Sequence, residues 1–224
     1  DLSQDGFCNK AHLDMMINLM RINRSDSCLD IGCGNGKISS YVESKTKCNI
    51  VGIDYSSNAI KHAQEMFPQN KYYIEDINKL TVQNNVYSTI NIIDSLYFSN
   101  DYVKTIVELY SSLIDDGEIG IFYSEMMFEK DKQKIIISEE TAVGKVLLKN
   151  KLYYEAIDIT KELYEIVKLK RVVGLELQKE FEKENNTFLF DRINMESIDK
   201  DMAYEDIVKF SPRFFYRIQK TKKI

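Results

Sequence analysis

The stretch SCLDIGCGNGKISS, residues 27–40, contains three of the chain's nine glycines, Gly32, Gly34 and Gly36. They follow directly on the apolar run at 28–31. A glycine-rich turn between a strand and a helix lets the backbone approach a ligand closely, and the helix N-terminus favours negative charge. The stretch therefore predicts a strand, a ligand-binding turn and a helix, in that order.

The spacing of these glycines fits neither a dinucleotide-binding turn nor a P-loop. A dinucleotide-binding turn has the pattern G-x-G-x-x-G, which would place its third glycine at position 37, where Lys37 stands. A P-loop requires Lys followed by Ser or Thr, and Lys37 is followed by Ile38. The pattern found is G-x-G-x-G, with Asp30 two residues ahead of it. A nicotinamide enzyme and a P-loop enzyme are both disfavoured.

Strand-like and helix-like patterns alternate over the first half of the chain. An amphipathic helix is expected at about 8–22, and Gly117 is expected to close the helix at 101–114. A second helix is expected at 36–44. A third begins at a cap on Ser56 or Ser57 and is stopped by Pro68. The strands are expected in CLDI, CNIVGIDYS, KYYIEDI, VYSTINIID and GEIGIFYSEM. This alternation predicts a parallel sheet that is covered by helices on both faces.

The alternation ends after residue 127. KLYYEAIDIT predicts a sixth strand, and RFFYRIQK alternates apolar and basic residues as a strand near a sheet edge does. Between them, residues of about 160–210 are charged, poor in glycine and helical in pattern. We therefore expect a single domain over 1–224, with a helical insert at about 160–210 that packs as a lid.

Composition limits the functions that are compatible with the chain. Thirty basic against thirty-five acidic residues give a net charge of −5, which disfavours a binder of nucleic acid. The apolar stretches are too short to span a bilayer, and no leader-like pattern is present, so we expect a soluble cytoplasmic protein without a membrane partner. The four cysteines form no CxxC pair and the chain has two histidines, so no metal site is expected.

The motif LDIGCGNG resembles the first motif of the class I S-adenosylmethionine-dependent methyltransferases. In that family the strand-end Asp and the glycine loop hold the methionine part of the cofactor. The resemblance implies that Asp30 meets the amino group of S-adenosylmethionine, directly or through water, and that Gly32, Gly34 and Gly36 leave space for the cofactor. It extends over about 27–128 and implies an α/β, Rossmann-like, doubly wound sheet of seven strands in the order 3-2-1-4-5-7-6, the last strand antiparallel.

Two further strand ends match the same family. Asp54 stands where the family carries the acidic residue that accepts both ribose hydroxyls, and Asp76 where a carboxylate accepts from the adenine amine. Tyr55 and Ile77 are the implied apolar walls to the adenine ring. Any one of these carboxylates could equally be a turn or cap residue, but three at successive strand ends favour a cofactor site.

The acceptor of the methyl group is less clearly marked. Methyl transfer from a sulfonium depends on proximity, alignment and exclusion of water, and a base is needed only if the nucleophile arrives protonated. The candidate catalytic residues are Asp94, which is also a candidate cofactor contact, Tyr97 and His12. His12 could equally be a surface or capping residue, and Tyr97 an ordinary half-buried aromatic. Other candidates for shaping the acceptor site are Tyr123, Glu125, Phe7 and Phe128.

We expect transfer of a methyl group to N, O or S of a small molecule, with S-adenosylhomocysteine as the second product. The fourth strand ends in IIDSLYFS and lacks the Asn/Asp-Pro-Pro-aromatic sequence of the branches that methylate bases and amides. Two alternatives stay open: a methyltransferase acting on protein or RNA, and a non-catalytic module that binds S-adenosylmethionine. A monomer and a homodimer are both compatible with the sequence.

Overall fold

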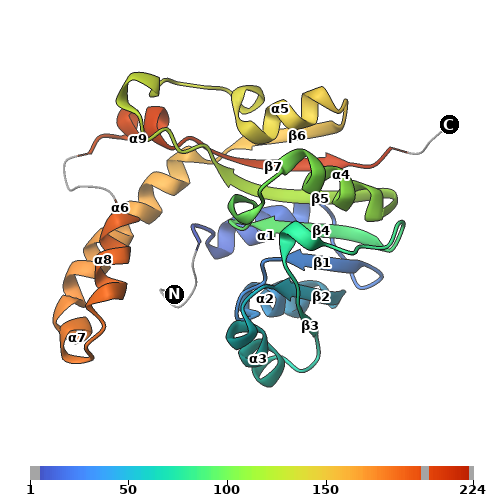
Figure 1. Ribbon diagram of the computed structural model, residues 1–224, viewed down its shortest axis with the longest axis horizontal. Coiled ribbons are helices and arrows are strands. Elements are labelled where there is room, and N and C mark those ends of the chain that lie inside the picture. The colour runs from blue at the N-terminus through green and yellow to red at the C-terminus, as the bar shows by residue number, and fades with distance from the viewer. Residues whose placement is uncertain (1–5, 198–201, 222–224) are drawn as a thin grey trace. The chain divides into compact units, whose positions relative to one another are not determined.

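The structure, a computed structural model, describes residues 6–197 and 202–221, in which strands and helices alternate through the first half of the chain (Figure 1). The first half contains α1 (Lys10–Leu19), β1 (Ser27–Ile31), α2 (Lys37–Thr46), β2 (Asn49–Asp54), α3 (Ser57–Met66), β3 (Lys71–Ile74), β4 (Tyr87–Ile93), α4 (Tyr102–Ser112) and β5 (Leu113–Ser124). The second half contains α5 (Ala142–Lys149), β6 (Tyr153–Asp158), α6 (Thr160–Glu176), α7 (Gln178–Lys183), α8 (Thr187–Met195), α9 (Tyr204–Phe210) and β7 (Arg213–Gln219). Short 3₁₀ turns include η1 (Ile77–Lys79) and η2 (Leu96–Phe98).

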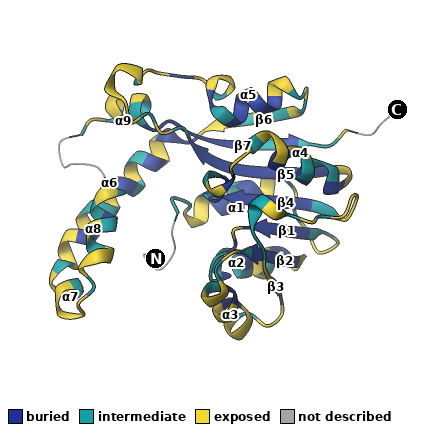
Figure 2. Ribbon diagram, viewed as in Figure 1, coloured by how far each residue is buried: buried dark blue, intermediate teal, exposed yellow. Residues whose placement is uncertain are grey.

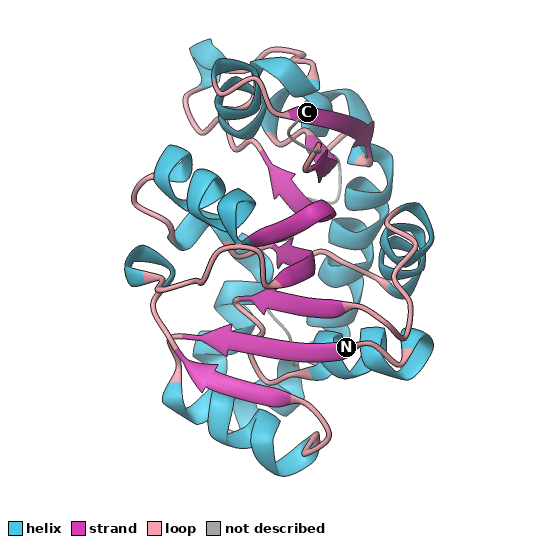
Figure 3. Cartoon of the chain, turned by 90° about the vertical axis from the view of Figure 1, so that its right-hand side faces the viewer, coloured by secondary structure: helices cyan, strands magenta, loops and turns pink. Residues whose placement is uncertain are grey.

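The seven strands form one sheet in the order β3-β2-β1-β4-β5-β7-β6, which confirms the predicted order. Strands β1 to β5 are parallel to one another, the last strand is antiparallel, and helices lie on both faces of the sheet (Figure 3). The strand order reverses between β1 and β4, where Leu29 lies opposite Ile90. In an open parallel sheet, ligands bind outside the carboxyl ends of the strands at such a reversal.

The central strands are apolar because both of their faces are covered. Leu29 on β1, Ile90 and Ile92 on β4, and Ile121 on β5 are all at most 1% exposed. Figure 2 shows these strands as the buried centre of the sheet. Continuous apolar runs of this kind are typical of parallel strands with helices on both sides.

Helix α3 begins and ends where the sequence predicts. The Ser56 hydroxyl accepts the Ala59 amide at 3.3 Å and so caps the first turn. Ile60 and Ala63 are buried against Tyr72 of β3. The helix ends at Met66, two residues ahead of Pro68.

The prediction for the end of the fourth helix is wrong. α4 ends at Ser112 rather than at about 114, and Gly117 lies within β5 instead of closing the helix. Leu113 pairs with Tyr87 of β4, and the Gly117 carbonyl accepts the amide of Lys220 at 2.9 Å. Pairing on both sides thus satisfies backbone groups that a longer helix would have satisfied internally.

The chain divides into two compact units. The first comprises residues up to 123, with 138–157 and 215 onward; the second comprises 124–137 and 158–214. Within the second unit α6 packs on α8, where Gly174 accommodates the side chain of Ile193 and Lys170 forms an ion pair with Glu196. The helical character of 160–210 is confirmed for the described residues, and its packing as a lid stays a prediction. Across both described ranges, no helix is long and apolar enough to cross a membrane.

Truncation of a central strand residue tests this account of the core. Ile92→Ala should lower the free energy of unfolding by about 2–5 kcal/mol, because it leaves a cavity between covered sheet faces. Ile114→Ala, at a side chain that is 39% exposed, is the matched control and should cost less than about 1 kcal/mol. Urea denaturation followed by circular dichroism measures both, and equal losses would contradict this account of the core.

Candidate functional site

A pocket of about 580 Å³ opens at the carboxyl ends of β1 to β4, within the first unit. Its volume lies in the range of sites for cofactors and small molecules. Of the residues predicted from the sequence, the wall includes Gly32, Gly34, Asp54, Tyr55, Asp76, Ile77 and Asp94. The pocket therefore lies at the reversal of strand order between β1 and β4.

The glycine loop is fastened to β2. The amides of Gly32 and Cys33 both donate to the carbonyl of Ile53, at 2.8 and 3.0 Å. A Cβ at Gly32 would lie 2.4 Å from the Cβ of Ser95, so only glycine allows this approach. A Cβ at Gly34 would meet no described protein atom within 4 Å and would project into open space beside the pocket.

Gly36 has a different role from the other two glycines. It precedes α2 in a left-handed conformation, and a Cβ there would lie 2.8 Å from the Tyr72 hydroxyl. It lies outside the residues that form the pocket wall. Gly36 thus allows close packing of the loop against β3 and α3 and makes no wall for a ligand.

The Asp54 carboxylate is held at the pocket by two backbone amides. Its Oδ2 accepts from Gly34 at 2.9 Å, and its Oδ1 accepts from Ser56 at 2.8 Å. Each carboxylate oxygen has a further lone pair, so a diol could still donate to both. The side chain is half-buried, which leaves it accessible from the pocket.

The Asp76 carboxylate is also fixed by its neighbours. Its Oδ1 accepts the amide of Asn78 at 2.9 Å and the Asn78 side-chain nitrogen at 3.0 Å. These hydrogen bonds, the backbone one foremost, hold the pKa of Asp76 below its ordinary value and keep it an acceptor. Beside it the exposed rings of Tyr55 and Phe98 lie 6.2 Å apart and form an apolar wall.

The structure holds Asp30 outside the pocket wall. It is 3% exposed, and its Oδ2 accepts the hydroxyl of Ser39. Burial raises the pKa of Asp30 to about 6, and the charge of Asp54 adds to this effect. Of the three predicted strand-end carboxylates, the structure brings Asp54 and Asp76 to the pocket and leaves Asp30 behind Ser39.

The candidates for the acceptor site are more scattered. Asp94 follows β4 and lines the pocket, and its Oδ2 accepts the amide of Phe7 at 2.7 Å. Tyr97 lies outside the wall and stacks on Tyr123 with ring centroids 5.1 Å apart. His12 is 3% exposed; its Nδ1 accepts the amide of Asn9 at 3.4 Å.

Two other candidates belong to the second unit. The Glu125 amide donates to the carbonyl of Pro212 at 2.9 Å, and Phe128, 73% exposed, has its ring 5.8 Å from that of Phe210. The N-terminal stretch DGFCNKAHL, residues 5–13, is expected from the sequence to help enclose the acceptor, and its first residue lies outside the described residues.

Sequence reasoning missed several residues of the wall. Asn78 ties η1 to η2, because its Nδ2 donates to the carbonyl of Phe98 at 3.0 Å and its Oδ1 accepts the amide of Asn100 at 2.7 Å. The pattern Asp76-x-Asn78 is typical of a side-chain-capped turn and could have indicated it. Phe98 and Ser95 carry no such signal, because their positions depend on how η2 packs.

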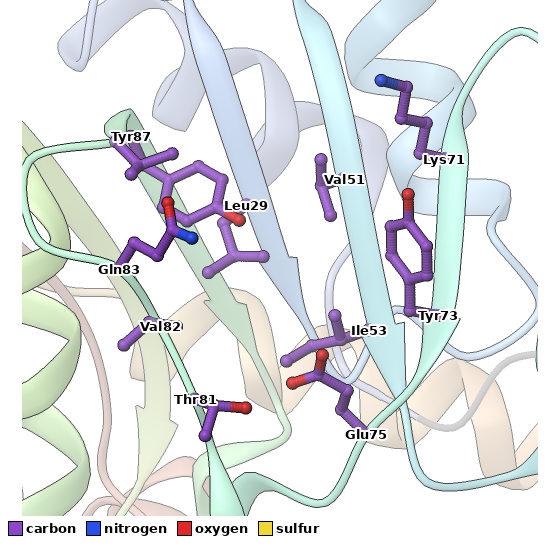
Figure 4. A pocket seen from close by; sticks show the side chains of 11 residues that line it. Leu29, Val51, Ile53, Lys71, Tyr73, Glu75, Thr81, Val82, Gln83 and Tyr87 are labelled. Atoms are coloured by element: carbon purple, nitrogen blue, oxygen red, sulfur yellow. The ribbon is translucent and has the colours of Figure 1, made fainter.

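A smaller hollow of about 350 Å³ lies on the face of β1, β2 and β3 (Figure 4). Leu29, Val51 and Ile53 form its floor, and Tyr73 and Tyr87 stand at its sides. It contains none of the glycine loop. Elsewhere in the described ranges, no three His, Cys, Asp or Glu side chains converge as metal ligands do.

Comparison with known proteins identifies the family. A family model described as a methyltransferase domain matches residues 22–206. "Putative methyltransferase 235L" of Invertebrate iridescent virus 6 is 39% identical over 62 residues, which are 27% of this chain and 23% of that protein. The chain thus matches about a quarter of the length of this curated relative.

Solved structures share the fold at low sequence identity. A methyltransferase from Thiobacillus denitrificans in complex with S-adenosylhomocysteine superposes with a TM-score of 0.67 at 14% identity, over 95% of this chain and 92% of that one. Haemonchus contortus phosphoethanolamine N-methyltransferase 2 with S-adenosylmethionine gives 0.66 at 17%, over 94% and 52%. The cyclase SpnF gives 0.71 at 14%, over 94% and 81%.

The chain belongs to the class I S-adenosylmethionine-dependent methyltransferases, with S-adenosylmethionine as its cofactor. The family and the cofactor are as the glycine motif predicted, and the seven-stranded Rossmann-like fold is confirmed.

The buried carboxyl of Asp30 generates a prediction about pH. A carboxyl whose pKa rises on folding, here from 3.8 to about 6, binds its proton more tightly in the folded state. The free energy of unfolding should therefore fall as pH rises between these values, by about 2–3 kcal/mol. Asp30→Asn should remove this part of the pH dependence in the ligand-free protein.

Urea denaturation at pH 4 and pH 7 measures the difference between wild type and variant. Asp115→Asn, at an exposed carboxyl, is the control and should follow the wild type. A constant difference between wild type and Asp30→Asn across this range would contradict the raised pKa.

Proposed function

We propose that this methyltransferase transfers the methyl group of S-adenosylmethionine to a small-molecule acceptor at N, O or S. The observation that carries the proposal is the pair of anchored carboxylates, Asp54 and Asp76, in one pocket with the open space beside Gly34. A nucleoside with a diol on one side and an amine on the other matches these two acceptors.

The residues of the wall divide the cofactor between them. Asp54 accepts the ribose hydroxyls, and Asp76 accepts from the adenine amine. Tyr55 and Ile77 flank the adenine ring, and Gly32 and Gly34 leave room for the methionine part. Asp30 supports this wall from behind, where its carboxylate accepts the Ser39 hydroxyl.

The bound cofactor supplies an activated methyl group on a sulfonium. The chain's residues then align the acceptor with that methyl group and exclude water. Alignment and exclusion of water supply most of the rate enhancement in a displacement of this kind. The β4 end, with Asp94 and Ser95, also lines the pocket and lies on the other side of β1 from β2 and β3, whose ends carry Asp54 and Asp76. The acceptor approaches from this end.

Two observations favour a small acceptor over a macromolecule. The chain carries a net charge of −5 and no dense basic stripe, so a polyanion would find little attraction. The Phe7 amide donates a hydrogen bond to Asp94, so residues 6 and 7 lie at the β4 end of the pocket, where they restrict the approach of a macromolecule. A protein or RNA acceptor and a non-catalytic binding role remain the alternatives that experiments should separate.

The acceptor class can be tested without knowing the acceptor. The protein is incubated with methyl-labelled S-adenosylmethionine and cell extract that has been divided by size. We expect label in the low-molecular-weight fraction. Label in protein or RNA would favour a macromolecular acceptor, and binding without transfer to any fraction would favour the non-catalytic alternative.

Removal of one carboxylate tests the cofactor site. Asp54→Ala should weaken binding of S-adenosylhomocysteine by about 2–4 kcal/mol, because it removes the ribose acceptor and releases the Gly34 amide. Isothermal titration calorimetry measures this loss, with Asp115→Ala as the surface control. NAD should give no measurable heat. An unchanged affinity in folded Asp54→Ala, or tight binding of NAD, would contradict the assignment.

A further inference from the structure

Asp94 has a left-handed backbone conformation. It follows β4 with φ +52°, in a region that Gly, Asn and Asp occupy more readily than most residues. It also forms part of the pocket wall. A left-handed residue in a pocket wall is a reason to ask which contacts hold it there.

A hydrogen bond fastens Asp94 to residues 6–9, which we call the N-terminal segment. Its Oδ2 accepts the amide of Phe7 at 2.7 Å, across 87 positions of sequence. Gly6, just ahead of Phe7, has φ +150°, and a Cβ there would lie 3.0 Å from the same oxygen. The backbone at residue 6 therefore comes close to the carboxylate, and a side chain there would crowd it.

The same segment is fixed again two residues later, at Asn9. The Asn9 side chain accepts the amide of His12 at 2.9 Å and so caps α1. Residues 7–9 are thus held between Asp94 at one end and the start of α1 at the other.

We propose that Asp94 is a positioning residue that fastens residues 6–9 to the β4 end of the pocket. The inference rests on the proposed function, because it concerns the end of the pocket from which the acceptor approaches. The fastening role needs only an oxygen lone pair at Oδ2.

Asparagine tests whether an acceptor oxygen is sufficient. It keeps an oxygen that can accept the Phe7 amide and is tolerated in the left-handed region. Asp94→Ala removes the acceptor and keeps the strain of a side chain at positive φ. Asp94→Gly removes the acceptor and relieves that strain. Comparison of Ala with Gly therefore separates loss of the contact from backbone strain.

Asp101 provides a matched control away from the pocket. Its Oδ1 accepts the Lys104 amide at 3.0 Å as the N-cap of α4. Asp101→Ala thus deletes the same kind of carboxylate-to-amide bond at a surface position. It controls for a general loss of stability.

Two measurements report on the contact without any acceptor. Hydrogen exchange of the Phe7 amide, followed by NMR, reports the hydrogen bond itself. The rate at which the protein releases radiolabelled S-adenosylhomocysteine, in a chase with unlabelled compound, reports the effect on the pocket. Loss of a charge-assisted bond should speed Phe7 exchange about tenfold or more in Asp94→Ala and Asp94→Gly, and release about fivefold.

Asp94→Asn should stay within about threefold of the wild type in both measurements, because a neutral acceptor weakens the bond without removing it. Asp101→Ala should leave both unchanged. Release from Asp94→Asn as fast as from Asp94→Ala, or fast Phe7 exchange with unchanged release, would overturn the proposal. Failure of the wild type to bind S-adenosylhomocysteine would instead refute the proposed function, while Phe7 exchange would still decide whether the contact exists.

Discussion

The attachment of the glycine loop to the end of β2 is the constraint on which the site depends. Two loop amides share the Ile53 carbonyl, and a third donates to the next side chain, Asp54. The loop that makes room for the ligand is therefore positioned by the same two residues that bring a ligand acceptor into the pocket. Because backbone amides set this geometry, a change in the loop or at the β2 end disturbs both together.

A second layer of interactions supports this corner from behind. Ser95 donates its hydroxyl to the Ile31 carbonyl at 2.6 Å, which joins the end of β1 to the residue after Asp94. Ser39 orients the buried carboxyl of Asp30 in the same region of β1. The ends of β1 and β4 are thus joined by one side chain and α2 is joined to β1 by another, and both contacts support the pocket wall from behind.

Local patterns in the sequence predict the glycine turn and the cap of α3 by Ser56, because each depends on residues close in sequence. The strand order follows only from the resemblance to the methyltransferase family, because it pairs segments that are far apart in the chain. The end of α4 was mispredicted because Leu113 pairs with β4 and Gly117 bonds to Lys220, a partner 103 positions away. The places of Asp54 and Asp76 in the pocket can be predicted, because each follows a strand whose carboxyl end lies at the same edge of the sheet. The contact between Phe7 and Asp94 does not, since neither residue carries a signal that names the other.

The left-handed backbone at Asp94 also narrows the chemistry that can evolve at this corner of the pocket. Asp, Asn and Gly adopt that conformation at low cost, whereas a β-branched or bulky side chain does not, so the position readily offers a carboxylate, an amide or no side chain. A β-branched or bulky group that shapes this corner would come from a neighbouring element. Diversification of acceptors in relatives with this backbone would thus be concentrated on the surrounding helices, with the strand end held constant.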